Sequence, residues 1–160
     1  MADTIIIYYS LSGNIDFIAR DLSKKLGADL CCLETVKNYP AKGLMKFLHG
    51  GKDALSGFKP ELKTALPDIS QYATVVLGAP VWASNPAAPL NTVLDTLDFS
   101  GKKVAAFVSS AGGDCEKVLE IIGARLRNAT LCATEGFVNP LKNPESALEK
   151  ISAFAERIRS

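Results

Sequence analysis

The sequence predicts an α/β fold built on a doubly wound parallel sheet, and three observations lead to it. Apolar runs alternate with amphipathic helical stretches along the whole chain, which implies parallel strands joined by right-handed crossovers. The run Thr74 to Ala79 is almost entirely β-branched or apolar, as in a strand covered on both faces. Residues 6–22 pass from an apolar strand through a turn of serines and glycine directly into a helix.

The first half of the chain supplies three predicted strands. The strand Thr4 to Tyr9 precedes a helix that Gly27 ends, with apolar residues at helical spacing: Ile15, Ile18, Leu22 and Leu26. Asp29 to Glu34 is the second strand. The run Thr74 to Ala79 is the third, and its apolar character places it at the centre of the sheet.

The second half continues the alternation. Asn85-Pro86 is predicted to cap and open a helix whose apolar positions are Leu90, Val93, Leu94 and Leu97. Lys103 to Val108 is the fourth strand, and the next helix is lined by Val118, Leu119, Ile122 and Leu126. Thr130 to Thr134 is the fifth strand. Asn143-Pro144 opens a last helix with inward positions Leu148, Ile151, Phe154, Ala155 and Ile158.

Length and composition indicate one domain, residues 1–160, because 48% hydrophobic and 22% charged residues are ordinary values for a soluble globular protein. The start of the chain lacks a basic segment, and the run Ile5 to Tyr9 is too short for a signal sequence or a membrane span. We therefore expect a cytoplasmic protein. A formal charge of +1 without a basic helix argues against a nucleic-acid partner.

The cysteines and the single histidine do not predict a metal site. Cys31, Cys32, Cys115 and Cys132 show no C-x-x-C spacing, and His49 has no second ligand near it in sequence. We expect the cysteines to be reduced and mostly buried.

The junction after the first strand has the features of a phosphate site. The first N–H groups of a helix lack intrahelical partners, and the macrodipole adds partial positive charge there. Ser10 and Ser12 add hydroxyl donors, and Gly13 lets the backbone approach closely. The loop has neither the three glycines of a dinucleotide fingerprint nor the Gly-Lys-Ser/Thr of a Walker loop. A plain strand–helix connection is the alternative.

This segment resembles the flavodoxin signature, in which an apolar strand ends in an aromatic and a hydroxyl residue and small residues follow at fixed spacing. The matching residues are Ile6, Ile7, Tyr8, Ser10, Gly13, Ala19 and Leu22. Ile15 stands where the family places a threonine that contacts the phosphate of flavin mononucleotide (FMN). The resemblance implies a flavodoxin-like three-layer sandwich with a five-stranded parallel sheet in the order 2-1-3-4-5, and a ligand site at the carboxyl ends of strands one, three and four.

Two later loops resemble flavin-binding segments of the same family. Residues 78–86 are similar to the G-x-P-V-W segment of flavodoxin-like proteins and flavin reductases. Trp82 is a candidate wall for the flat isoalloxazine ring, and a core tryptophan is the alternative. Residues 109–115 resemble a T-S-G-G loop, and Asp114 can cap the helix that follows.

The resemblance therefore implies an FMN site assembled from three loops. Its cofactor-binding residues are Ser10, Leu11, Ser12, Gly13, Asn14 and the Ile15 amide at the phosphate, Pro80, Val81, Trp82, Ala83 and Ser84 beside the ring, and Ser109, Ser110, Ala111, Gly112 and Gly113 at the pyrimidine edge. No side chain is expected to act as a catalytic acid or base, because the flavin itself accepts a hydride or electrons.

Two departures from electron-carrying flavodoxins favour a reductase. Such carriers are strongly acidic and often stack a tyrosine on the flavin from the loop after the fourth strand, whereas this chain has a charge of +1 and no tyrosine there. The expected reaction is NAD(P)H-dependent reduction of a quinone or similar acceptor. The alternatives are an electron carrier for a protein partner and a binding module with a weakened FMN site, and monomer and homodimer remain open.

The segment 39–66 is longer than a simple crossover needs, and Phe47 to Ala54 resembles an F-x-x-G-G-x-x-A motif of some flavodoxin-like proteins. Its surplus of lysines either forms a solvated helix face or attracts an anion such as the phosphate of NADPH. His49 is either a surface residue or a proton donor to a reduced substrate.

Other chemistries of this fold leave residues that the chain lacks. A receiver domain needs acidic residues after the first strand, where Tyr9-Ser10 stands. A small tyrosine phosphatase needs Cys, five residues and then Arg, and a serine hydrolase needs a G-x-S-x-G elbow. None of these patterns occurs in the sequence.

Overall fold

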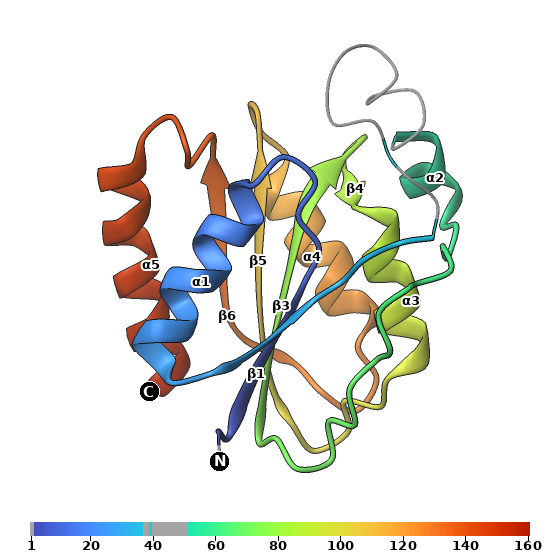
Figure 1. The fold of residues 1–160 in the computed structure, drawn as a ribbon, viewed down its shortest axis with the longest axis horizontal. Helices are drawn as coiled ribbons and strands as arrows, with labels where there is room; N and C mark the ends of the chain where they lie inside the picture. The colour runs from blue at the N-terminus through green and yellow to red at the C-terminus, as the bar shows by residue number, and fades with distance from the viewer. Residues whose placement is uncertain (1, 37–38, 40–50) are drawn as a thin grey trace.

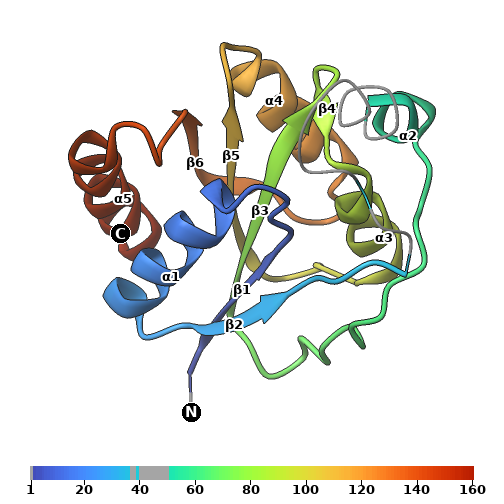
Figure 2. The same cartoon turned by 45° about the horizontal axis from the view of Figure 1, so that its top comes forward.

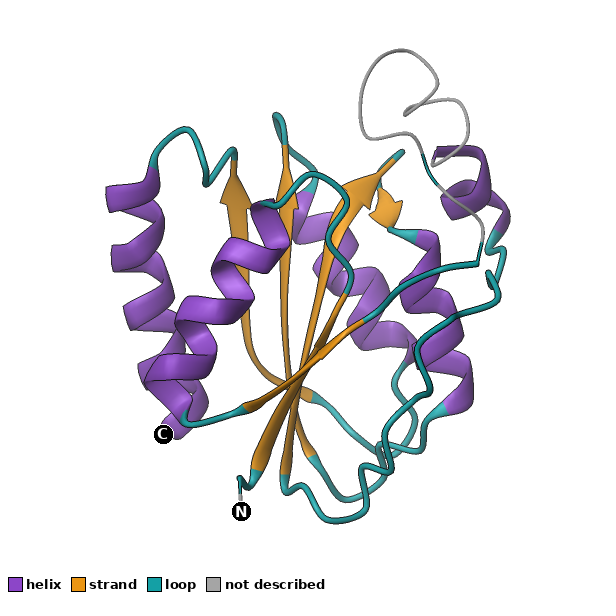
Figure 3. Ribbon diagram, viewed as in Figure 1, coloured by secondary structure: helices purple, strands orange, loops and turns teal. Residues whose placement is uncertain are grey.

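The computed structural model describes residues 2–36, 39 and 51–160 and places a parallel sheet between two helical layers (Figures 1 and 3). Helices α1 (Asn14–Leu26) and α5 (Pro144–Arg159) cover one face. Helices α3 (Ala88–Thr96) and α4 (Cys115–Arg125) cover the other. The short helix α2 (Gly51–Ser56) lies beside the end of the sheet toward which the strands point. The predicted three-layer sandwich is confirmed.

The five parallel strands follow the predicted order. They are β1 (Thr4–Tyr8), β2 (Asp29–Cys32), β3 (Thr74–Trp82), β5 (Lys103–Ser110) and β6 (Leu131–Val138). The sheet order β2-β1-β3-β5-β6 is 2-1-3-4-5 when only these strands are counted. A sixth, two-residue strand, β4 (Asn85–Pro86), pairs antiparallel with the end of β3.

Strand β4 corrects one prediction. Asn85-Pro86 does not open the next helix, because Asn85 pairs with Trp82 and Pro86 with Val81 in a tight hairpin. Helix α3 begins at Ala88 instead, with Pro89 in its first turn. The hairpin was not predicted because the turn residues Ala83 and Ser84 adopt φ values of 50° and 60°, which their residue types do not signal.

Several predicted boundaries are also too short, because backbone pairing continues beyond the apolar runs. Strand β3 extends to Trp82, and its Pro80 still pairs with Ser109 of β5. Strand β6 extends to Val138. Leu97 and Leu126 were predicted to line helices, but they are the C-cap residues that follow α3 and α4. Leu148 of α5 was predicted to face inward, but its side chain is 38% exposed.

Alternate residues of β1 pack into two separate cores, one on each face of the sheet. Ile5 and Ile7 of β1 pack with the apolar residues of α3 and α4. Ile6 and Tyr8 pack with α1 and α5. Within the described part of the chain, no helix is both long and apolar enough to cross a bilayer.

The cysteines are free thiols, but the prediction that they are mostly buried is wrong. Cys32 and Cys132 are exposed, and Cys31 and Cys115 are half-buried. The two exposed thiols lie on β2 and β6, the strands at the two edges of the sheet, where an outward-facing side chain meets solvent.

The predictions for the segment 39–66 are tested only in part. His49 and the first half of the F-x-x-G-G-x-x-A motif, residues 47–50, lie outside the described residues. Tyr39 is buried, and its hydroxyl donates a hydrogen bond to a carboxylate oxygen of Asp53 at 2.6 Å. Lys59 pairs with Asp95 at 2.9 Å.

Gly78 provides a test of the packing between the sheet and the α1–α5 layer. A Cβ atom on Gly78 would lie 2.3 Å from Cζ of the fully buried Phe107. We expect Gly78→Ala to lower the free energy of unfolding by about 1–3 kcal/mol, since overpacking forces a buried ring to move. Urea denaturation measures this change.

Gly112→Ala is the matched control, because a Cβ atom there meets no atom within 4 Å. It should change the free energy of unfolding by less than about 0.5 kcal/mol. Equal effects of the two substitutions would contradict the packing described for Gly78.

Candidate functional site

Three loops meet where β1, β3 and β5 end, on the side of the molecule turned forward in Figure 2. They enclose a crevice of about 250 Å³. The lining residues are Leu11, Ser12, Asn14, Pro80, Val81, Trp82, Ala83, Ser109, Ser110, Ala111 and Asn139. All except Asn139 are among the residues predicted from the sequence, so the three predicted loops do come together.

The other predicted residues lie next to the crevice without lining it. They are Ser10, Gly13, Ile15, Ser84, Gly112 and Gly113. Each belongs to one of the three loops or to the first turn of α1, and several of them hold those loops in place.

The loop after β1 leaves backbone donors free at the start of α1. Gly13 takes the left-handed conformation at φ 96°, which glycine adopts without strain. The N–H of Asp16 donates to Ser10 Oγ at 3.0 Å, and the N–H of Phe17 donates to the Gly13 carbonyl at 3.0 Å. The N–H groups of Asn14 and Ile15 find no acceptor among the described residues. They are available to an anion.

Ile15 offers only its backbone to this loop. Its side chain is 1% exposed and packs in the core between the sheet and the α1–α5 layer. The position at which flavodoxins place a threonine therefore supplies hydrocarbon to the core here, and the hydroxyl is absent from the site.

A polar group beside the crevice fixes the first turn of α1. The hydroxyl of the buried Tyr8 donates to Asp16 at 2.6 Å, and Arg20 donates to the other oxygen of this carboxylate at 2.8 Å. Burial is the largest cause that raises the pKa of Tyr8, and the hydrogen bond to Asp16 is the next. Burial alone would raise the pKa of Asp16, but the hydrogen bonds from Tyr8 and Arg20 outweigh it and lower that pKa. The carboxylate stays ionised near the positive end of the helix dipole.

Trp82 lies both at the crevice and in the core. Its indole lines the crevice, yet it is only 5% exposed and packs in the core. The ring of Tyr9 meets it edge-on at 5.7 Å between centroids, and the ring of Tyr39 lies 4.8 Å away. Trp82 Nε1 is buried and has no hydrogen-bond partner among the described residues. An unpaired buried donor is costly, so a ligand acceptor at this wall would be stabilised.

The loop after β5, residues 111–114, is held by serines. Ser110 Oγ accepts the N–H of Gly113 at 3.0 Å. Asp114 stands at the N-cap position of α4, but its side chain does not cap the helix as predicted. Its φ of 64° directs the carboxylate elsewhere, and it accepts the Ser84 hydroxyl at 2.5 Å. This bond joins the β3–β4 turn to the loop after β5.

Asn139 is the lining residue that sequence reasoning missed. It follows β6, a strand predicted to end four residues earlier, at Thr134. The dipeptide Asn139-Pro140 is a turn signal that could have located the end of this strand.

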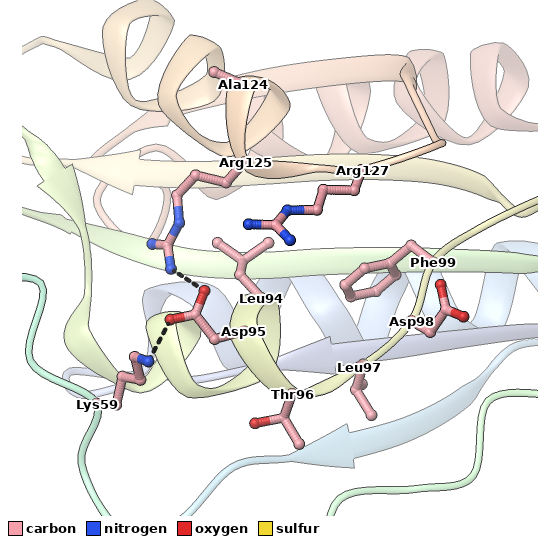
Figure 4. A pocket seen from close by; sticks show the side chains of 10 residues that line it. All are labelled: Lys59, Leu94, Asp95, Thr96, Leu97, Asp98, Phe99, Ala124, Arg125 and Arg127. Atoms are coloured by element: carbon pink, nitrogen blue, oxygen red, sulfur yellow. Dashed lines mark hydrogen bonds and ion pairs between the residues drawn. The ribbon is translucent and has the colours of Figure 1, made fainter.

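A larger cavity of about 750 Å³ lies at the other end of α3 and α4, away from the three loops (Figure 4). Its charged groups largely pair with one another. Asp95 lies 2.9 Å from Lys59 and 3.1 Å from Arg125. The hydrogen bond from Lys59 lowers the pKa of Asp95. Burial opposes this shift, and Arg125 adds to it. None of the predicted site residues contributes to this cavity.

Comparison with known proteins agrees with the fold and with the sequence motifs. The sequence profile of the family described as flavodoxin matches residues 3–143. A search of the curated proteins found no match.

Three solved structures illustrate the likeness. The flavoprotein of Lactobacillus acidophilus NCFM, solved in complex with FMN, is 22% identical with a TM-score of 0.73, covering 91% of this chain and 99% of that chain. Oxidised flavodoxin 2 of Bacillus cereus is 25% identical with a TM-score of 0.62, covering 99% and 98%. Rubredoxin oxygen:oxidoreductase of Desulfovibrio gigas is 17% identical with a TM-score of 0.64, covering 97% of this chain and 34% of that chain.

The profile match extends from before β1 to the residue that caps α5, and it includes every loop of the crevice. The chain belongs to the flavodoxin family.

Proposed function

We propose that this protein is an FMN-dependent oxidoreductase that takes a hydride from NAD(P)H and reduces a quinone or a similar small acceptor. FMN is the cofactor supported by the family match and by the FMN complex of the Lactobacillus flavoprotein. The three-loop crevice is the proposed site, and its chemistry can be compared with each part of the cofactor.

The start of α1 suits the phosphate of FMN. The free N–H groups of Asn14 and Ile15 point from the positive end of a 13-residue helix. Ser10 Oγ already accepts a backbone N–H, which leaves the hydroxyl hydrogen of Ser10 as a donor. None of the described lining residues has a charged side chain, so among these residues dipoles and hydroxyls would hold the dianion.

The rest of the crevice suits a flat ring with polar edges. Leu11, Pro80, Val81 and Trp82 supply apolar walls, and the unpaired Nε1 of Trp82 is a donor for a ring acceptor. The backbone of residues 109–113 would face the pyrimidine edge. The bound flavin supplies the redox chemistry, as a group that accepts a hydride or single electrons. The protein's part is to orient the ring and to leave room for the reactants.

The loop after β5 is the feature that favours a reductase over an electron carrier. The loop after β5 contains no aromatic residue, and a Cβ atom on Gly112 or Gly113 would meet no atom within 4 Å. A second reactant could approach the ring from this side. The net charge of +1 also offers little to attract a basic protein partner.

The burial of the Ile15 side chain favours a second candidate, a binding module or electron carrier with a weakened FMN site. A hydrogen bond to a charged group contributes roughly 1.5–3 kcal/mol, which corresponds to one to two decades of affinity. Loss of one such bond would leave measurable FMN binding, because the amides of Asn14 and Ile15 remain.

The visible spectrum tests the proposed function. Added FMN should bind, with a perturbed flavin band and quenched fluorescence of Trp82, which is the only tryptophan in the chain. The complex should then oxidise NADPH when a quinone is present. Protein that leaves the FMN spectrum unchanged would exclude both redox functions, whereas FMN binding without NADPH oxidation would indicate a carrier.

Ala111→Tyr tests whether a second reactant approaches the ring past the loop after β5. Ala111 lines the crevice and is exposed, so the loop should tolerate a larger side chain there. An aromatic ring at this position should leave FMN affinity within about twofold and reduce NADPH–quinone turnover by about tenfold or more, because access to the flavin is blocked. Gly113→Tyr is the matched control, because Gly113 belongs to the same loop but does not line the crevice. Unchanged turnover in Ala111→Tyr would contradict access from this side.

A further inference from the structure

The loop between β6 and α5, residues 139–143, is fastened to the loop after β5. The N–H of Asn139 donates to the Ser110 carbonyl at 3.0 Å. Asn139 Nδ2 donates to the Ala111 carbonyl at 3.2 Å. Both acceptors belong to residues that line the crevice, and Asn139 lines it as well. Two bonds from one residue therefore fix where Ser110 and Ala111 lie.

The same β6–α5 loop is fastened to the loop after β1. The N–H of Leu141 donates to Asn14 Oδ1 at 3.2 Å, and Asn14 Nδ2 donates to Ser12 Oγ at 3.3 Å. The side chain of Leu141 also covers Gly13, since Cδ1 lies 3.5 Å from the position of a Cβ atom on that glycine. A backbone N–H can only donate, so the contact with Leu141 sets which end of the Asn14 amide faces Ser12.

This arrangement determines what the serines can offer a ligand. Ser12 Oγ accepts from Asn14, and Ser110 Oγ accepts from the N–H of Gly113. A hydroxyl has one hydrogen, so an oxygen that is occupied as an acceptor keeps that hydrogen to donate. Both serines line the crevice, where they are prepared for an acceptor-rich ligand such as a phosphate or a flavin edge.

We propose that the β6–α5 loop is a fourth loop of the cofactor site and that Asn14 and Asn139 are positioning residues. Asn14 fastens this loop to the phosphate-binding end of the crevice, and Asn139 fastens it to the loop at the ring. The inference rests on the proposed binding of FMN in this crevice. Fixing the loops before the cofactor arrives reduces the ordering cost of binding.

The division between the two asparagines gives distinct expectations. Asn139 acts on residues 110 and 111, so its loss should weaken FMN and riboflavin by the same factor. Asn14 acts on Ser12 and the start of α1, so its loss should weaken FMN while leaving riboflavin, which has no phosphate, unchanged. A purely structural contribution of Asn14 to folding would not separate the two ligands, and the corresponding test for Asn139 is hydrogen exchange in the loop after β5.

Asn139→Gly isolates the side-chain bond without backbone strain. Asn139 has a φ of 45°, a conformation that glycine adopts freely, so the variant keeps the backbone and removes the side chain with its donor Nδ2. Asn128→Gly is the matched control, because Asn128 has a φ of 57° and its carbonyl accepts the N–H of Gly101 at the other end of the sheet. Asn139→Asp is a second variant that keeps the preference for positive φ but cannot donate from its carboxylate.

The experiment measures FMN and riboflavin dissociation constants of the wild type, both Asn139 variants, Asn14→Ala and Asn128→Gly by flavin fluorescence. Asn139→Gly should raise both constants by roughly threefold to tenfold, the effect of one neutral hydrogen bond. Asn14→Ala should raise the FMN constant alone by a similar factor. Asn128→Gly should match the wild type for both ligands.

Hydrogen exchange of the protein without FMN gives an independent measurement. Residues 110–113 should exchange faster in Asn139→Gly than in Asn128→Gly, while α5 stays protected in both. The proposed role of the β6–α5 loop is wrong if the wild type binds FMN and Asn139→Gly matches Asn128→Gly both in FMN affinity and in hydrogen exchange. A wild type that does not bind FMN would instead remove the proposed function.

Discussion

Parallel pairing of β1, β3 and β5 is the constraint on which the whole site depends. Tyr8 of β1 lies opposite Gly78 of β3, and Gly78 lies opposite Phe107 of β5, so the three strands end at one edge of the sheet. The loops that follow them are distant in sequence, yet this register brings them around one crevice. Gly78 is central to that register because only a residue without a side chain leaves room for the buried ring of Phe107. The pairing of the apolar strands thus determines where the site lies.

The described part of the crevice presents dipoles rather than charged side chains to a ligand. The N–H groups at the start of α1, the hydroxyls of Ser12 and Ser110 and the indole N–H of Trp82 are possible hydrogen-bond donors there, and no acceptor among the described residues pairs with the N–H groups of Asn14, Ile15 and the indole. Ile15 contributes both to the core, through its side chain, and to the loop after β1, through its backbone. Its side chain stabilises the core below α1, and the site keeps its amide but not a hydroxyl. The nearest fixed charge in the first turn, Asp16, is engaged by Tyr8 and Arg20.

The features predicted from sequence were those with local causes. Apolar periodicity located every parallel strand and the helices packed on them, because burial on one or two faces leaves a pattern in the residues themselves. Loop motifs located the crevice lining except Asn139. The features that were not predicted depend on partners distant in sequence. Strands β3 and β6 are longer than predicted because they continue to pair with β5. Asp114 accepts a hydrogen bond from Ser84 instead of capping α4, and Asn139 donates to the Ala111 carbonyl on the neighbouring loop. The sequence could not assign Trp82 to the crevice or to the core because it belongs to both, with Tyr9 and Tyr39 packed against it.

An amide NMR titration with FMN tests whether the carboxyl ends of the parallel strands form one flavin site. We expect the largest chemical-shift changes at residues 12–15, 81–84, 109–113, 139 and 141, with little change around the larger cavity of Lys59, Arg125 and Arg127. Changes centred on that larger cavity, or no changes at FMN concentrations that saturate related flavoproteins, would contradict it.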